Sequence, residues 1–314
     1  MKLLISGGRG YLGGRLAQFI ASSTSHEIIL GTRRHTFSPC WLPQAKVVQT
    51  QWEENEALER ICSGIDVVIH LAGMNAQDCA LNSTQALEFN GVVTSRLLNA
   101  AIKQDVKRFI YLSTAHVYGS PLVGVISEAN CPLSLHPYAT SHRAGEDVIR
   151  SAHQRKEIEG IVIRLSNSFG APVHRDVNCW MLLVNDLCRQ AVTTKKLVLK
   201  SSGMQTRDFI TMTDVCRAIT HLSELENYKL GDGLYNVGGA ATLTILEMTK
   251  CVADRVSEVM GFRPEIVCEG HGRAEKAEPL DYRVDKITGT GFGLYGNFDD
   301  EIDRLITFCR ECFC

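Results

Sequence analysis

The sequence predicts an α/β fold, in which a small C-terminal lobe is interleaved with a doubly wound parallel sheet. Two patterns indicate this fold class: short, continuous apolar runs alternate with segments of helical spacing, and no linker or repeat divides the chain into independent units. Uninterrupted apolar runs are typical of strands that helices cover on both faces. The expected strands are Lys2–Ser6, Glu27–Leu30, Asp66–Leu71, Arg108–Thr114 and Gly160–Leu165.

The segments between these strands have the apolar spacing of amphipathic helices. The expected helices are Tyr11–Ser22 and Thr84–Ala101. Nearer the C-terminus, the pattern predicts short strands at Lys196–Leu199 and Leu234–Val237 and a helix at Ile245–Met260. We therefore expect residues 1–170 to form the sheet domain, with residues 205–240 returning to it. Residues 171–204 and 241–314 would form the lobe.

Composition excludes some classes of protein. The chain has 314 residues, of which 45% are hydrophobic and 22% charged, and its formal net charge is −2. This balance argues against binding to nucleic acid or to an anionic membrane by bulk charge. No apolar stretch approaches the ~20 residues that cross a bilayer. The first apolar run reaches Ser6 too soon for a signal peptide, so we expect a cytoplasmic protein.

The cysteines predict free thiols. There are 12 of them, scattered along a chain long enough to build a core without disulfides. The tail carries Cys309, Cys312 and Cys314 together, but a structural zinc site needs four ligands and the next candidate is remote in sequence. We expect no metal.

A glycine-rich segment follows the first expected strand and precedes the first expected helix. Such a turn lets backbone N–H groups approach a pyrophosphate, and the positive end of the helix faces the same charge. This placement predicts a Rossmann-like dinucleotide site. The candidate cofactor contacts in this segment are Gly7, Gly10, Tyr11, Leu12 and Gly13.

The end of the second strand predicts which dinucleotide binds. An acidic residue there would bind the ribose 2′-hydroxyl of NAD. This chain has Arg33 and Arg34 instead, with Arg9 in the glycine-rich segment, and guanidinium groups suit a 2′-phosphate. We therefore expect NADP in preference to NAD, although two arginines also commonly solvate a loop.

Seven further motifs follow in order along the chain. They are Asp66–Gly73; Asn90 with Thr94; Arg108–Gly119; Pro137–His142; Arg164–Gly170; Gln205–Ile210 with Asp214; and Tyr235–Gly239. With the glycine-rich segment, they resemble the extended short-chain dehydrogenases/reductases, in the branch of NAD(P)-dependent nucleotide-sugar epimerases and dehydratases. The resemblance runs almost from end to end and implies a nucleotide-sugar substrate.

The resemblance also implies roles for matching residues. Thr114 would hydrogen bond the reacting oxygen, and Tyr138 would transfer its proton while hydride moves to or from the nicotinamide. Residues lining the cofactor would be Leu71, Ala72, Gly73 and Asn90. Asn167 and Arg207 would lie along the diphosphate of the substrate. Relatives often form homodimers through the two helices predicted at Thr84–Ala101 and Tyr138–Ala152.

The chain departs from the family at His142, where relatives have a lysine that lowers the pKa of the tyrosine. A tyrosine with a pKa of ~10 is a poor base near neutrality, and a histidine with a pKa of ~6.5 is mostly neutral there. Three alternatives stay open: His142 replaces the lysine, another group supplies the charge, or catalysis is lost while cofactor binding is kept.

Two more residues are substrate candidates. His116 stands where the family's 4,6-dehydratases have the second residue of an Asp-Glu pair, and Ala115 holds the first position, which argues against that activity. His116 is either an auxiliary acid or base or a packing residue. Trp180 either stacks on the substrate or packs in the core of the lobe.

The sequence leaves three functions open. We expect an NADP(H)-dependent keto-sugar reductase acting on a nucleotide-linked sugar. The first alternative is a nucleotide-sugar epimerase that keeps NAD(P) bound. The second is a non-catalytic NADP-binding scaffold or sensor, an alternative motivated by His142.

Overall fold

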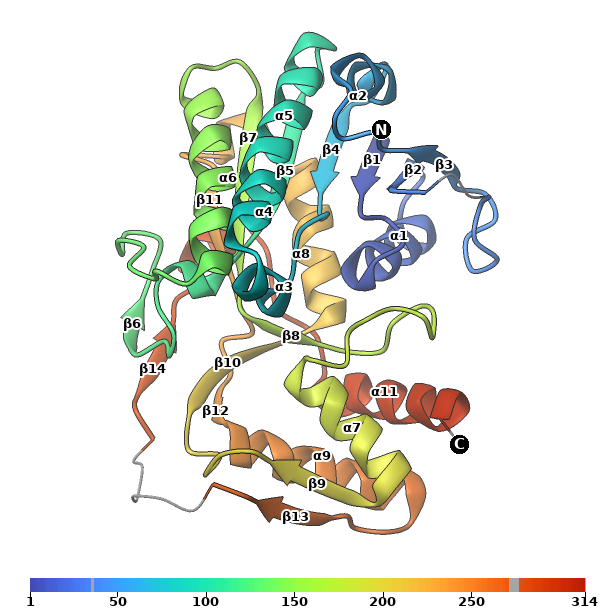
Figure 1. Cartoon of the computed structure of the whole chain (residues 1–314), viewed down its shortest axis with the longest axis vertical. Helices are drawn as coiled ribbons and strands as arrows, with labels where there is room; N and C mark the ends of the chain where they lie inside the picture. The colour runs from blue at the N-terminus through green and yellow to red at the C-terminus, as the bar shows by residue number, and fades with distance from the viewer. Residues whose placement is uncertain (35–36, 271–276, 314) are drawn as a thin grey trace.

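A seven-stranded parallel sheet forms the upper half of the molecule (Figure 1). The computed structural model describes residues 1–34, 37–270 and 277–313. In spatial order, the strands are β3 (Lys46–Gln49), β2 (Glu27–Thr32), β1 (Lys2–Ser6), β4 (Val67–His70), β5 (Arg108–Thr114), β7 (Glu159–Leu165) and β11 (Leu234–Val237). The chain reverses its direction of travel across the sheet between β1 and β4. Ligands of such sheets bind beside this switch point, at the carboxyl ends of the strands.

Alternate residues of the strands enter two separate cores. In β1, Leu3 and Ile5 enter one core and Leu4 the other, and all three are fully buried. The first core is covered by α1 (Tyr11–Ser23) and α8 (Met212–Glu224). The second is covered by α2 (Asn55–Cys62), α5 (Thr94–Lys103) and α6 (Pro137–Gln154). The sheet is therefore buried on both faces, as its apolar strands require.

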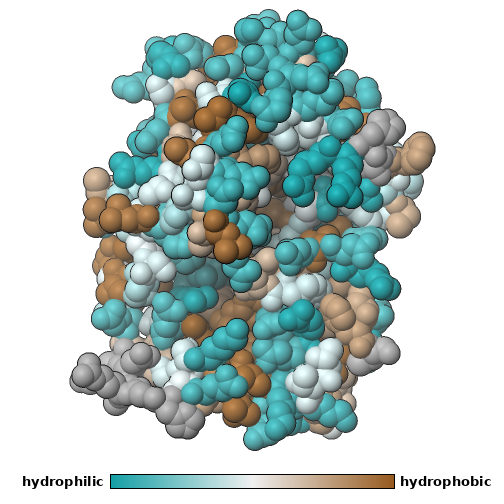
Figure 2. All heavy atoms as spheres, in the orientation of Figure 1, coloured by the Kyte–Doolittle hydropathy of each residue, from teal (hydrophilic) through white to brown (hydrophobic). Residues whose placement is uncertain are grey.

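The remaining elements of the sheet domain connect these layers. They are α3 (Ala76–Leu81), α4 (Ser83–Leu87), the π-helical segment η1 (Glu88–Val93), the 3₁₀ helices η2 (Ala115–Val117) and η3 (Asn227–Lys229), and α10 (Asp285–Thr288). A short parallel pair, β6 (Gly124–Ile126) and β14 (Leu280–Tyr282), lies beside the main sheet. Figure 2 shows that the exterior is largely hydrophilic on the face in view.

The lobe has its own core below the sheet domain. Its helices are α7 (Leu183–Thr194), α9 (Ile245–Met260) and α11 (Phe298–Phe313), which pack together around Leu187, Val252 and Leu305. Its strands are β8 (Asn167–Phe169), β10 (Thr206–Thr211) and β12 (Thr242–Thr244) in one sheet, and β9 (Lys196–Leu199) and β13 (Glu265–Cys268) in another.

Polar contacts attach the lobe to α1. The Tyr11 hydroxyl donates to the Gly170 carbonyl at 2.8 Å, and the Arg15 guanidinium donates to the Ala171 carbonyl at 2.7 Å. Arg15 also forms an ion pair of 3.0 Å with Glu301 on α11, whose side chain is 2% exposed. Residues 170–171 and helix α11, which are remote from each other in sequence, are thereby both held against α1.

The predicted α/β fold with a parallel sheet is confirmed, and two local expectations are corrected. Residues Thr84–Ala101 do not form one regular helix, because the π-helical turns of η1 interrupt α4 and α5. The edge strand β3 was not predicted, since it is short and only partly buried. Within residues 205–240, β11 joins the main sheet while β10 pairs in the lobe. The predicted domain boundaries stay a prediction.

Candidate active site

The glycine-rich turn between β1 and α1 has no room for side chains. Gly7 has a φ of 69°, and a Cβ atom there would lie 3.0 Å from the backbone nitrogen of Ala72. A Cβ atom on Gly13 would clash with the carbonyl oxygen of Gly7, and the Gly10 N–H donates to that same oxygen at 2.8 Å. The turn therefore presents bare backbone at the carboxyl end of β1.

The amino end of α1 is suited to an anion. Gly10 is its N-cap, and the described residues supply neither a side-chain cap nor an acidic residue in the first turn. The side chains of Tyr11 and Leu12 pack inward, with the Tyr11 hydroxyl bound to Gly170, so only their backbone remains for a ligand. Exposed N–H groups and the helix dipole favour a phosphate there. The turn fits a dinucleotide pyrophosphate.

The end of β2 carries positive charge at the same edge of the sheet. Gly31 on β2 is the register partner of Ser6 at the end of β1. Beyond it, the side chains of Arg33 and Arg34 are exposed, as is that of Arg9 in the glycine-rich turn. Residues Gly31–Arg34 contain no carboxylate to repel a 2′-phosphate.

The segment after β4 forms the next wall of the site. The N–H groups of Leu71 and Ala72 donate to the Ser6 hydroxyl at 3.2 and 3.3 Å. Asn90 is 1% exposed; its amide oxygen accepts from the Met74 N–H at 2.9 Å, and its amide nitrogen donates to Ser141 at 3.0 Å. Asn90 thus holds the loop containing Gly73 against α6.

Thr114 and Tyr138 meet where β5 ends and α6 begins. Pro137 occupies the first turn of α6, and the His136 side chain caps the helix by accepting from the Tyr138 N–H at 3.2 Å. The Tyr138 hydroxyl forms a hydrogen bond with Thr114. Burial raises the pKa of Tyr138, and this hydrogen bond opposes the rise only in part. Tyr138 is therefore protonated at neutral pH.

His142 lies one helical turn after Tyr138, and its side chain is 6% exposed. Its ring centroid is 4.6 Å from that of Tyr138. Burial lowers the pKa of His142 to about 4, because the charged imidazolium would lose its hydration. The alternative in which a charged His142 replaces the lysine therefore does not fit this geometry.

His116 packs near Tyr138, and Arg207 lies close enough to His116 to act on its pKa. The His116 ring centroid is 6.5 Å from that of Tyr138, and the backbone N–H of His116 donates to Thr114 at 3.2 Å. Burial, with the charge of Arg207, lowers the pKa of His116. Burial likewise lowers the pKa of the Arg207 guanidinium, which hydrogen bonds to Gln205 and has no carboxylate ion pair among residues 1–34, 37–270 and 277–313. An anionic ligand would satisfy this cation.

Two predicted substrate residues have contacts within the protein. The Asn167 amide donates to the Asp208 carbonyl at 2.9 Å and ties β8 to β10. The Trp180 ring packs against Phe308 and Phe313 of α11, with centroid separations of 6.4 and 5.0 Å. The structure thus favours the packing alternative for Trp180, because its ring belongs to the core of the lobe.

Several buried polar residues around the site were not predicted from the sequence. Tyr111 binds His142, and His70 lies between Ser6 and Thr94. Glu146 pairs with Arg164 and accepts from Ser113. For Tyr111, His70 and Arg164, the one sequence signal is a polar residue inside an otherwise apolar strand, which does not say what it contacts.

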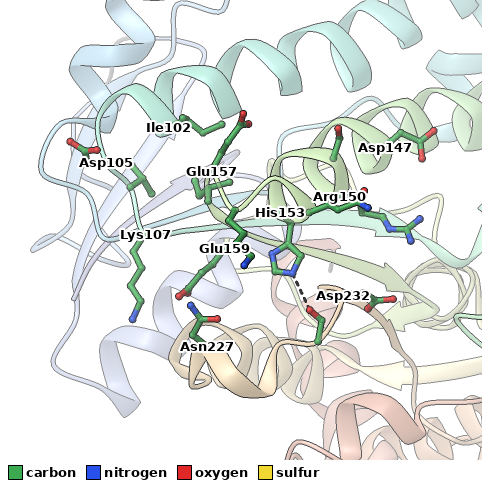
Figure 3. A pocket seen from close by; sticks show the side chains of 16 residues that line it. Ile102, Asp105, Lys107, Asp147, Arg150, His153, Glu157, Glu159, Asn227 and Asp232 are labelled. Carbon is green, nitrogen blue, oxygen red and sulfur yellow. Dashed lines mark hydrogen bonds between the residues drawn. The ribbon is translucent and has the colours of Figure 1, made fainter.

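A mixed-charge depression of about 1160 Å³ lies at the opposite edge of the sheet (Figure 3). It is lined by Lys107 and Glu159 near the amino ends of β5 and β7 and by Arg150 and His153 on α6. Both ring nitrogens of His153 have protein partners, the Gly231 carbonyl and the Gly160 N–H. This depression is remote from the glycine-rich turn and Tyr138.

Within residues 1–34, 37–270 and 277–313, no helix is both long and apolar enough to cross a membrane. The same residues contain no cluster of three or more His, Cys, Asp or Glu side chains arranged to hold a metal. Cys309 is buried in the lobe, whereas Cys314 lies outside the described residues.

Fold and site together define an enzyme of the extended short-chain dehydrogenase/reductase type. The chain belongs to the NAD-dependent epimerase/dehydratase family, whose model matches residues 3–238. It is accordingly an NAD(P)-dependent oxidoreductase of the nucleotide-sugar epimerase/dehydratase type.

Individual relatives are distant. The chain is 22% identical to the low-salt glycan biosynthesis protein Agl12 of Haloferax volcanii, over 98% of each chain. It is 26% identical to the human dTDP-D-glucose 4,6-dehydratase, over 79% of this chain and 70% of that one. A solved UDP-glucuronic acid 4-epimerase from Bacillus cereus, in complex with NAD, aligns with a TM-score of 0.81 at 20% identity, covering 99% of this chain and 97% of the other.

Proposed function

We propose that this enzyme is a keto-sugar reductase that acts on a nucleotide-linked sugar with NADPH. The observation that carries the proposal is the protonated Tyr138 beside Thr114, with a neutral His142 where relatives have a lysine. A general acid must hold its proton until the reacting oxygen takes it, and a tyrosine with a raised pKa does so.

The direction of reaction follows from this protonation state. Reduction of a carbonyl needs a proton donor, and Tyr138 supplies the proton to the carbonyl oxygen while Thr114 hydrogen bonds the same oxygen. When bound, the cofactor would supply the hydride to the carbonyl carbon. Oxidation of an alcohol needs Tyr138 as a base, which requires a nearby cation to lower its pKa, and His142 is neutral.

Charge indicates which residues would hold the diphosphate of the substrate. Arg207 is half-buried and hydrogen bonds to a neutral glutamine, so it is suited to a diphosphate. Asn167 lies on the neighbouring strand β8. His116, between Tyr138 and Arg207, is placed to contact the sugar or to relay a proton.

The cofactor is proposed to be NADP on the basis of Arg33 and Arg34. The Bacillus cereus neighbour is in complex with NAD, which makes NAD the alternative to exclude. Titration with NADPH and NADH distinguishes the two. We expect the double variant Arg33→Ala/Arg34→Ala to lose affinity for NADPH about tenfold or more, and to bind NADH as before.

An epimerase is the second candidate, because the aligned neighbour is a 4-epimerase. The non-catalytic scaffold is the third, since His142 is neutral. Mass spectrometry of the denatured protein tests the second: near-stoichiometric released NADP or NAD favours an enzyme that keeps its cofactor through the cycle.

Turnover of UDP-4-keto-sugars with NADPH, followed between pH 6 and 9, is the decisive experiment. A reductase with protonated Tyr138 has a nearly constant rate over this range. An epimerase that needs the phenolate accelerates about tenfold per pH unit below the pKa of its tyrosine. A protein that binds NADPH and turns over no nucleotide sugar supports the scaffold.

We also propose a homodimer that forms through α5 and α6. These helices lie side by side on one face of the sheet (Figure 1), and a shallow groove between them is lined by Leu98, Asn99, Ser151 and Arg155. Sedimentation of the wild type and of Asn99→Glu, at an exposed position of the groove, tests it. A wild-type monomer at micromolar concentration contradicts the proposal.

A further inference from the structure

His142 is enclosed between two tyrosines. Its ring centroid is 5.8 Å from that of Tyr111 on β5 and 4.6 Å from that of Tyr138 on α6. Tyr111 is 1% exposed. The two rings hold the imidazole in one orientation, so the chemical character of each ring nitrogen is set by its neighbours.

The Tyr111 hydroxyl determines the state of Nδ1. It lies 2.9 Å from Nδ1 of His142 and 3.3 Å from the backbone carbonyl oxygen of Asn90. A carbonyl oxygen can only accept, so a hydrogen bond from Tyr111 to Asn90 uses the single proton of the hydroxyl. The Tyr111 oxygen then accepts from His142, which requires the imidazole proton to be on Nδ1.

The other nitrogen is left without a proton and faces the cofactor wall. A Cβ atom on Gly73 would lie 3.8 Å from Nε2 of His142 and 3.6 Å from Cε1. Gly73 belongs to the loop after β4 that Ser6 and Asn90 hold in place. In the part of the chain that the structure describes, no residue hydrogen bonds to Nε2.

A buried hydrogen-bonded network connects this pair with the glycine-rich turn. Thr94 also interacts with Tyr111, and the Thr94 hydroxyl lies 3.0 Å from Nε2 of His70. Nδ1 of His70 lies 2.6 Å from the hydroxyl of Ser6, the last residue of β1. The side chain of Tyr111 is therefore fixed from two directions and cannot turn away from His142.

We propose that Tyr111 is a positioning residue that holds His142 as the neutral Nδ1–H tautomer, so that Nε2 accepts a hydrogen bond from a hydroxyl group of the bound cofactor or nucleotide sugar. The family's lysine would present a charged donor at this place. The hydroxyl ligand rests on the proposed function; the tautomer does not.

Burial, and not a neighbouring charge, determines whether His142 is protonated. The ionisable groups placed against it are Tyr138 on α6, Tyr111 on β5 and His70 on β4. Glu146 and Cys79 act on Tyr111, and His116 packs against Tyr138. Glu146 is ion-paired with Arg164, which removes its charge as a partner for an imidazolium.

Nuclear magnetic resonance of the protein labelled with ¹⁵N-histidine tests the tautomer. The spectrum of His142→Asn assigns the signal by its disappearance. We expect Nδ1 to be protonated and Nε2 unprotonated, with no titration from pH 8 to 5. A proton on Nε2 in the wild type, or titration near pH 6.5, overturns the proposal.

Tyr111→Phe tests the positioning role. Without the hydroxyl, we expect His142 to move toward the Nε2–H tautomer and NADPH to bind about tenfold more weakly, the effect of one lost hydrogen bond. Tyr235→Phe is the matched control, because it removes another buried tyrosine hydroxyl, bonded to the Leu230 carbonyl at 2.8 Å. We expect the control to bind NADPH as the wild type does.

The outcomes separate this proposal from the proposed function. An unchanged tautomer in Tyr111→Phe overturns the positioning role. A changed tautomer with unchanged NADPH affinity and unchanged KM for the nucleotide sugar overturns the acceptor role. A wild type with the expected tautomer that binds no nicotinamide cofactor contradicts the proposed function and leaves the Tyr111–His142 pair confirmed.

Discussion

Glu146 and Arg164 form a buried ion pair between α6 and β7. The Arg164 guanidinium donates to the Glu146 carboxylate through Nε at 3.1 Å and through Nη2 at 2.6 Å. The two side chains are 0% and 2% exposed. Ser113 donates to the same carboxylate, so the pair joins α6, β7 and the end of β5. It fixes the backbone that carries both Thr114 and Tyr138.

Glu146→Gln should destabilise the fold strongly. Removing one partner leaves Arg164 as an uncompensated buried charge, which costs about 3 kcal/mol or more. Urea denaturation measures the loss. The exposed ion pair of Arg155 and Glu157 supplies the control, and Glu157→Gln should leave the free energy of unfolding nearly unchanged. Equal losses in the two variants would show that burial is not the cause.

Tyr138→Phe should lose turnover and keep the cofactor. Removing the proton donor lowers kcat by about 10²–10⁴-fold, while the ring still packs against His142. Thr114→Val should lower kcat as well. Steady-state kinetics with a parallel NADPH titration measures both quantities. Tyr228→Phe, at a tyrosine that is 78% exposed, is the control. Unchanged kcat in Tyr138→Phe would remove this residue from the chemistry.

Gly7→Ala and Gly64→Ala form a matched pair. Both glycines have a φ of 69°, so alanine strains the backbone equally at both. A Cβ atom at Gly7 would lie 3.0 Å from the Ala72 nitrogen, whereas one at Gly64 would meet nothing within 4 Å. We expect only Gly7→Ala to lose cofactor affinity, measured by NADPH fluorescence. Loss of NADPH affinity in both variants would mean that backbone strain alone is enough to weaken cofactor binding.

Two buried histidines should make the fold sensitive to acid. Burial lowers the pKa of His70 to about 3 and that of His142 to about 4, below the ordinary value near 6.5. Between these values the unfolded chain binds protons that the folded chain does not, so stability is present above pH 6.5 and is lost as pH falls. From pH 7 to pH 5, each histidine contributes a loss of about 2 kcal/mol.

The measurement compares the wild type with His142→Gln at pH 7 and pH 5. A comparison is needed because burial raises the pKa of Asp208 to about 6, which has the opposite effect on stability in this range. We expect the variant to lose less stability than the wild type on acidification. Parallel losses would mean that His142 is protonated in the folded protein.

The elements that the sequence predicted best are those whose signal is local. β1, β5, β9, β11 and α9 have the predicted bounds, because apolar runs and helical spacing mark where each is buried. The edge strand β3 and the π-helical interruption η1 have no such signal. Both depend on what packs against them, which the local pattern does not contain.

The predictions for the candidate site show the same difference between local sequence signals and contacts made by distant segments. The Thr114–Tyr138 hydrogen bond and the bare glycine-rich turn agree with the positions expected from the motifs. Trp180 stands beside the same motifs in sequence, yet its ring packs on α11. Tyr111 and His70 were missed, since a polar residue in an apolar strand does not reveal its partner.

By itself, the sequence determined the class of fold, the glycine-rich turn and the approach of Thr114 to Tyr138, because each depends on spacing along one or two adjacent elements. The tertiary structure alone decided the character of His142. Its neutrality and its tautomer depend on burial and on Tyr111, which lies 31 residues away in sequence. A pKa and a hydrogen-bond direction are set by surroundings in three dimensions, and the chain assembles these surroundings from β4, β5, α3 and α6 only when it folds.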